Sequence, residues 1–238
     1  MATKGATLQK NIIVFDIEAC TWNFKADKGF LLCVGYKYLG DSKTTVLEKK
    51  KFGDPFDDKE LCKRVYDVLA DSSVEGYIGH NHKWFDIPFL NTRFLLNGMS
   101  PLPQARIFDT CDVMYKKLKM GNSLKNAIWQ FKLPSEKTTL DLPGSLRAAM
   151  GDKKEMALIV DHCRKDVEST ELLYNKLLPL GANGWSMAAL SRNKEACPQC
   201  GVVGKLVRKG WKVAVSRKSQ QFQCMACGGW HCGKAEAL

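Results

Sequence analysis

An apolar run that ends in two acidic side chains constrains the fold of this chain more than any other feature. Residues 11–18 read NIIVFDIE, and the apolar part predicts a buried β-strand. Alternate side chains of a strand share a face, so Asp16 and Glu18 point to the same side, about 7 Å apart. Two such carboxylates repel each other unless a cation, usually a divalent metal ion, lies between them. Alternatively, the two acids mark only the polar end of a core strand.

The composition is that of a globular protein with one main core. The chain has 238 residues, of which 45% are hydrophobic, enough for one core and a small appended domain. No apolar run approaches the roughly 20 residues of a membrane span, and the first residues lack the apolar core of a signal peptide. We therefore expect a cytoplasmic protein, in the host cell if the source is viral. Its ten cysteines then predict buried thiols or metal ligands instead of disulfides.

The positive charge is concentrated near the C-terminus. The chain has a formal net charge of +11, and residues 191–238 hold nine Lys or Arg but only two acidic residues. A basic tail on a nearly balanced body indicates a polyanionic partner, most simply nucleic acid.

The order of the expected elements predicts an α/β fold. After the first strand and a turn-like segment at 20–29, the patterns predict strands at 30–39, 44–49, 74–80 and 106–109. They predict helices at 57–70, 87–96, 124–131 and 153–178, with a loop at 134–144. This order favours a sheet covered by helices over a doubly wound Rossmann fold. Neither a GxGxxG motif nor a P-loop motif occurs.

A second acidic segment lies at the expected junction between a strand and a helix. Residues 79–90 read GHNHKWFDIPFL, where Asp86 could cap the helix or join a site at the end of the sheet. His80 and His82 could contact substrate, although isolated histidines at such junctions are more often structural.

The third segment lies on the long predicted helix. His162 and Asp166 are four residues apart, so their angular offset is only about 40° and they share a face. Asp161 lies about 140° from Asp166 and should not join the same site. The pair is either a solvated surface pair or part of a site, where histidine suits a general base.

Together these three segments resemble the exonuclease motifs of the DEDD 3′–5′ exonucleases. The matching residues are Phe15-Asp16-Ile17-Glu18, Asn81-x-x-x-Phe85-Asp86 and His162-x-x-x-Asp166. The stretch 79–93 is especially similar to the second motif of family B polymerase proofreading domains, and Asp109-Thr110 and Ser123-Leu124 also fall where that group has similar residues. Over residues 11–180, the resemblance implies an RNase H-like fold: a mixed five-stranded sheet flanked by helices.

The resemblance also implies a mechanism. Asp16, Glu18, Asp86 and Asp166 would hold two Mg²⁺ or Mn²⁺ ions, and Asn81 and Phe85 would contact nucleic acid. The family has Tyr-x-x-x-Asp or His-x-x-x-x-Asp at its third motif, whereas this chain has His-x-x-x-Asp. His162 would therefore orient or deprotonate the attacking water, or else be too short to reach it.

Two CxxC pairs in the tail predict a zinc site. Cys197, Cys200, Cys224 and Cys227 can supply the four soft ligands of a tetrahedral zinc ion. Segments 205–207 and 212–215 between the pairs predict strands, and the whole resembles a zinc ribbon. His231 and Cys232 are a rival ligand pair that we expect to be bystanders.

Basic and aromatic residues alternate between the two cysteine pairs. The expected nucleic-acid contacts there are Lys205, Arg208, Lys209, Trp211, Lys212, Arg217 and Lys218. Cationic side chains neutralise phosphates and aromatic rings stack on bases. The ribbon would then bind nucleic acid, or alternatively serve only as a stabilising cap.

The sequence thus predicts an exonuclease domain at 1–180, a linker at 181–195 and a zinc ribbon at 196–238. The expected activity is metal-dependent 3′–5′ hydrolysis of DNA, or of RNA. Two alternatives are a non-catalytic nucleic-acid-binding scaffold and a proofreading or repair subunit that acts with a separate polymerase.

Overall fold

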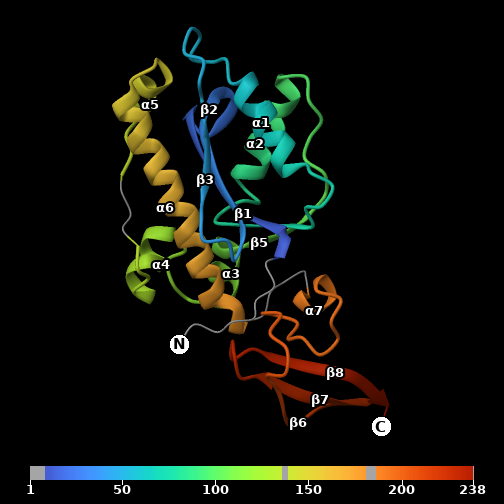
Figure 1. Cartoon of the computed structure of the whole chain (residues 1–238). Coiled ribbons are helices and arrows are strands. Elements are labelled where there is room, and N and C mark those ends of the chain that lie inside the picture. Colours follow the sequence, from blue (N-terminus) through green and yellow to red (C-terminus); the bar gives the residue numbers. More distant parts are fainter. Residues whose placement is uncertain (1–8, 136–138, 181–185, 238) are drawn as a thin grey trace. The chain divides into compact units, whose positions relative to one another are not determined.

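The computed structural model describes residues 9–135, 139–180 and 186–237 (Figure 1). Contacts divide the chain into two compact units, one covering Lys10–Leu173 and the other containing the chain from Tyr174 onward. Within the described ranges, no helix combines the length and the apolar character needed to cross a membrane.

The first unit is built on the mixed five-stranded sheet that the sequence predicted. Its strands are β1 (Gln9–Trp22), β2 (Lys25–Leu39), β3 (Thr45–Glu48), β4 (Gly76–Gly79) and β5 (Arg106–Asp109), in the spatial order β3-β2-β1-β4-β5. β2 and β3 pair antiparallel, whereas β1 with β4 and β4 with β5 pair parallel. The carboxyl ends of β4 and β5 lie beside the middle of β1, just before Asp16, because β1 pairs with β4 at residues 12–14 and continues to Trp22. α/β proteins place their sites at such strand ends.

β1 and β2 form a long hairpin, so the predicted turn-like segment at 20–29 is wrong. β1 continues to Trp22 and β2 begins at Lys25. The two residues between them, Asn23 and Phe24, have φ of 52° and 57°. Two consecutive left-handed residues match the right-handed twist of a hairpin and allow the tightest connection. The sequence pattern missed this turn because Phe24 is an unusual residue at positive φ.

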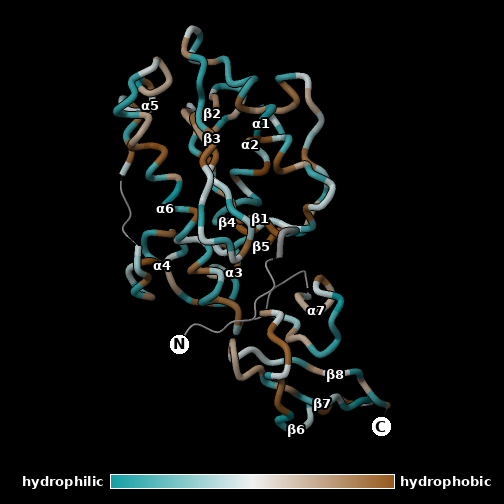
Figure 2. Tube along the Cα trace, viewed as in Figure 1, coloured by the Kyte–Doolittle hydropathy of each residue, from teal (hydrophilic) through white to brown (hydrophobic). Residues whose placement is uncertain are grey.

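Helices cover both faces of the sheet (Figure 1). One apolar cluster joins Ile13, Phe15 and Ile17 to α1 (Lys59–Leu69) and α2 (Asp86–Leu96). A second cluster joins Cys20 to α5 (Leu142–Ala149) and α6 (Lys153–Leu177). Hydrophobic segments accordingly run through the central strands in Figure 2. Because strand side chains alternate, Asp16 and Glu18 lie on the face of β1 that α6 covers.

Two short helices of the first unit were not predicted, and both begin at an aspartate cap. Asp109 accepts hydrogen bonds from the first amides of α3 (Thr110–Lys117), and Asp141 accepts one from Gly144 at the start of α5. The predicted loop at 134–144 thus ends inside α5, because proline is tolerated in the first turn of a helix; residues 136–138 of that loop lie outside the described residues. The cap predicted for α4 (Leu124–Phe131) is confirmed, since Ser123 Oγ accepts from the amide of Asn126 at 3.2 Å.

The second unit contains η1 (Leu178–Leu180), α7 (Met187–Leu190) and a three-stranded antiparallel sheet. Its strands are β6 (Leu206–Ala214), β7 (Arg217–Cys224) and β8 (Trp230–Ala237), in that spatial order. The two short strands predicted at 205–207 and 212–215 fall largely within the single strand β6, which carries a bulge between Arg208 and Trp211. The predicted linker at 181–195 includes α7, and its residues 181–185 lie outside the described residues.

Candidate active site and metal centre

β1 presents the first two carboxylates beside α6. Asp16 and Glu18 are both half-buried on this strand. Helix α6 is fixed against the sheet by Cys163, whose sulfur accepts the Gly35 amide at 3.1 Å and lies 3.5 Å from the carbonyl oxygen of Asp16. A side chain at Gly35 would press on that sulfur, so glycine permits the close approach. The position of α6 relative to the two acids is therefore closely defined.

Asp86 is directed at β1 and does not act as a helix cap. It is the first residue of α2, whose N-cap position is Phe85 and has no side-chain cap. The carboxylate is only 3% exposed, and its Oδ1 accepts the backbone N–H of Ile17 at 3.3 Å. Because Ile17 lies between Asp16 and Glu18, this hydrogen bond places Asp86 next to the acidic pair.

His162 and Asp166 lie on the buried face of α6. They are 7% and 6% exposed, which excludes a solvated surface pair. His162 Nε2 lies 3.5 Å from Glu18 Oε1 and 3.6 Å from Asp166 Oδ2. Asp161 points elsewhere, since its half-exposed carboxylate pairs with Arg164 and Lys165.

A cavity of about 460 Å³ opens beside these groups. Asp16 and Asp166 both line it, together with His80, Asn81, Cys111, Asn122, Ser123, Leu124 and Lys125. No role was expected from the sequence for Cys111, Asn122 or Lys125, because they belong to short polar segments that carry no motif of their own. The only nearby signals were Asp109-Thr110 and Ser123-Leu124.

The loop that carries Asn81 is held by Asp109. Asn81 has a left-handed backbone with φ of 72°, a conformation that asparagine tolerates better than most residues. The buried Asp109 carboxylate accepts the amide of Asn81 at 2.9 Å and that of Lys83 at 3.0 Å. The Asn81 carbonyl in turn accepts the amide of Phe85 at 3.0 Å. This network fixes the path of the chain toward Asp86.

The remaining residues of the second segment have different environments. His80 lines the cavity, with its Nδ1 2.9 Å from Thr110 Oγ1, which itself donates to the carbonyl of Gly79. Phe85 is half-buried against Phe24 and Phe89, with ring centres 6.1 Å and 5.6 Å away.

His82 cannot contact substrate, because its side chain is fully buried. The possible substrate role considered from the sequence is therefore wrong for this residue.

The donor atoms around α6 suit a divalent cation. Glu18, His162 and Asp166 each offer one ligand atom, and these atoms lie within 4.8 Å of one another. Asp16 and Asp86 are not part of this group of three. Carboxylate oxygens suit Mg²⁺ and Mn²⁺, and an imidazole nitrogen extends the range toward transition metals.

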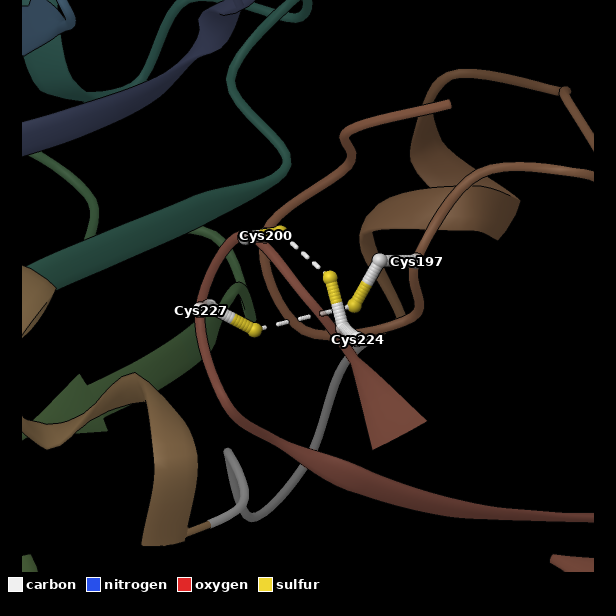
Figure 3. A group of neighbouring side chains, drawn as sticks. All are labelled: Cys197, Cys200, Cys224 and Cys227. Carbon is white, nitrogen blue, oxygen red and sulfur yellow. Dashed lines mark hydrogen bonds between the residues drawn. The ribbon is translucent and has the colours of Figure 1, made fainter. Parts of the chain in front are cut away.

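The four predicted zinc ligands converge in the second unit (Figure 3). The sulfur atoms of Cys197 and Cys227 are 3.9 Å apart, and those of Cys200 and Cys224 are 3.8 Å apart. Each CxxC turn is followed by a glycine, Gly201 or Gly228, with φ of 75° or 76°. The amide of each glycine donates to the carbonyl of the first cysteine of its pair, at 2.9 Å and 2.8 Å. Two matching turns that present four thiols are compatible with a zinc ribbon.

One of these thiols already favours the thiolate form. Hydrogen bonds from the Cys200 thiol and from the amides of Cys200 and Gln199 lower the pKa of Cys197 to about 4. The same contact with Cys197 raises the pKa of Cys200. His231 Nε2 lies 3.3 Å from the Cys197 sulfur, outside the group of four thiols, and Cys232 is exposed.

Basic side chains on and beside β6 are open to solvent. Lys205, Arg208, Lys209, Trp211, Lys212 and Arg217 are all exposed. Lys218 is half-buried, and its ammonium group lies 4.9 Å from the ring centre of Trp211, a cation–π contact. Six of the seven residues predicted to bind nucleic acid in the C-terminal unit are thus exposed to a partner.

Comparison with known proteins identifies one family. A family model described as the RNase_H superfamily matches residues 13–178, which is more than half of the chain. A search of curated proteins found none that matches this chain.

Proposed function

The chain belongs to the RNase_H superfamily, and we propose that it is a DEDD-type exonuclease that removes nucleotides from 3′ ends in a metal-dependent reaction. Membership of this superfamily indicates a nuclease-type activity on nucleic acid. The finer proposal is supported by one observation. Three segments, containing residues 16–18, 86 and 162–166, bring four carboxylates and a histidine together beside the middle of β1.

The carboxylates Asp16, Glu18, Asp86 and Asp166 would hold two Mg²⁺ or Mn²⁺ ions. Bound there, such ions would activate the attacking water and neutralise the charge that develops on the phosphate and the leaving 3′ oxygen. The Ile17 amide holds Asp86 in place, and Cys163 fixes α6 against the strand that carries Asp16. Catalysis of this kind depends on such fixed positions.

His162 is proposed as the group that orients the attacking water and accepts its proton. Its Nε2 lies between Glu18 and Asp166, and its side chain is shielded from bulk water. A neutral imidazole near pH 7 can accept a proton, which a carboxylate engaged with cations does poorly.

The cavity beside the carboxylates would receive the terminal nucleotide. Its volume of about 460 Å³ lies within the range of small-ligand sites. Lys125 would supply a cation and Ser123 a hydroxyl for phosphate, while Asn81 would contact the sugar or base. Phe85 is not among the residues that line the cavity, and its contact with nucleic acid stays a prediction. We propose DNA as the substrate, with RNA as the alternative.

The C-terminal unit is proposed to bind one Zn²⁺ through its four cysteines and to hold nucleic acid on the β6 side. All residues of β6 after Leu206 are exposed, so the strand has no buried face of its own. A sheet with so little core depends on a metal for its fold. Its exposed lysines and arginines would bind phosphates.

Digestion of end-labelled DNA and RNA in Mg²⁺ or Mn²⁺ tests the proposal. We expect nucleotides to be released from the 3′ end, and Asp166→Asn to lower the rate by about 100-fold or more. Asp161→Asn is the matched control on the same helix and should leave the rate unchanged, because Asp161 is half-exposed outside the site. Equal rates for the parent protein and Asp166→Asn, or release from the 5′ end, would refute the proposal.

A further inference from the structure

His82 is fully buried beside Asp86, one of the proposed metal ligands. Its ring packs on Phe15, the residue before Asp16, with ring centres 4.0 Å apart and planes inclined by 33°. On the other side it fills the space that a side chain at Gly79 would need, since a methyl group there would overlap three atoms of the ring. The backbone is also engaged, because the His82 carbonyl accepts the Ile87 amide at 3.0 Å. Both strands that flank the site therefore fix this ring.

The polar edge of the ring faces Asp86. His82 Nδ1 lies 3.2 Å from Asp86 Oδ2, while Oδ1 of the same carboxylate accepts the Ile17 amide. Asp86 thus has a neighbour at each oxygen, one from β1 and one from the loop after β4. These two neighbours can define the rotation of the carboxylate as well as its position.

Burying an imidazole in this space is energetically unfavourable. Among the described residues, neither ring nitrogen of His82 makes a hydrogen bond of regular geometry, and Nδ1 has only the short separation from Asp86. Leaving a buried polar atom unsatisfied is unfavourable, and an apolar side chain between Phe15 and Gly79 would avoid that cost. A buried polar group of this kind in a folded protein calls for a reason, and in the described part of the chain the carboxylate within hydrogen-bond distance of His82 belongs to the site.

We propose that His82 is a positioning residue for Asp86. Its Nδ1–H donates to Oδ2 and holds the carboxylate in the orientation that binds a divalent ion. The nearby carboxylate favours the tautomer with the proton on Nδ1, which leaves Nε2 as the acceptor in the apolar part of the pocket. The inference rests on the proposed function only in that Asp86 serves as a metal ligand. Donors to the ligands of a metal typically change metal affinity by about 10–100-fold.

Two nearly isosteric substitutions separate this role from simple packing. His82→Asn keeps an N–H donor near the position of Nδ1, whereas His82→Leu has almost the same shape and no donor. Mn²⁺ affinity is measured on the full zinc-loaded chain without nucleic acid, from the electron paramagnetic resonance signal of free Mn²⁺. Thermal unfolding of the same samples without Mn²⁺ provides the second readout.

The two readouts separate Mn²⁺ binding from folding. We expect His82→Leu to bind Mn²⁺ about 10–100-fold more weakly than the parent, and His82→Asn to retain most of the affinity. Without Mn²⁺, both variants should still unfold in one cooperative transition, so that the measured affinities are those of folded protein. Equal Mn²⁺ affinities for the two variants would overturn the proposal and leave His82 a packing residue. Because no nucleic acid is present, the affinity ratio decides this question even if the parent protein digests neither DNA nor RNA.

Discussion

Replacing Asp109 should destabilise the first unit and disorganise the loop that leads to Asp86. The buried Asp109 carboxylate accepts the backbone amides of Asn81 and Lys83 from that loop, and those of Cys111 and Asp112 at the start of α3. In Asp109→Ala, loss of the helix cap costs about 1 kcal/mol. Each loop amide loses a hydrogen bond to a charged group, worth about 1.5–3 kcal/mol. The expected loss of unfolding free energy is therefore about 4 kcal/mol or more, a large part of the stability of a typical domain.

Urea unfolding followed by tryptophan fluorescence measures this loss, and the nuclease assay is run on the fraction that remains folded. Asp109→Asn should lose less, because its amide oxygen still accepts hydrogen bonds but carries no charge. Asp112→Asn is the neighbouring control: its carboxylate pairs with Lys83 and Lys116 near the surface, and such pairs contribute at most about 1 kcal/mol. An Asp109→Ala protein as stable as the Asp112→Asn control and fully active would refute the reasoning.

Three further outcomes follow from the structure. Gly79→Ala should destabilise the fold by about 1–3 kcal/mol, because the added methyl group overlaps the His82 ring. Adding His82→Ala to the same chain should relieve much of that loss, and a double-mutant cycle of unfolding free energies measures the coupling. Cys200→Ser should weaken Zn²⁺ retention and unfold the C-terminal sheet, while residues 10–173 stay folded. Hydrogen exchange with and without a chelator measures this, and a sheet protected to the same extent without zinc would contradict the prediction. Lys212→Ala should reduce the slope of log binding constant against log salt concentration for single-stranded nucleic acid by about 0.7. Lys153→Ala, at an exposed position on α6, should leave that slope unchanged. Identical slopes for the two variants, measured by fluorescence anisotropy, would argue against binding at the β6 surface.

Local patterns in the sequence predicted the framework of the fold well. The apolar run before Asp16, the polar junction around Asp86 and the helical spacing of His162 and Asp166 each carry their signal within a few residues. Strand β1 and the buried face of α6 then bring these segments together. The resemblance to the DEDD motifs gave the same three segments.

Features that depend on distant parts of the chain were missed. The hairpin turn at Asn23 and Phe24 is set by the pairing of two long strands, and Phe24 gives no local turn signal. The burial of His82 depends on Phe15, far away in sequence, and on the absence of a side chain at Gly79. Likewise Asp109 is a helix cap that also binds a loop 26–28 residues earlier, and no periodicity in the sequence reports such a contact.

The wide spacing of the site residues along the chain has a consequence for folding kinetics. The hydrogen bond between Ile17 and Asp86 closes a separation of 69 residues, and the contact between Cys163 and Asp16 closes one of 147. Contacts of such long range form slowly because the loop entropy is lost before the contacts are gained. During synthesis, β1 and its two acids leave the ribosome long before α6 can cover them. Recovery of nuclease activity after dilution from denaturant should therefore follow the docking of α6, and lag behind formation of the hairpin between β1 and β2.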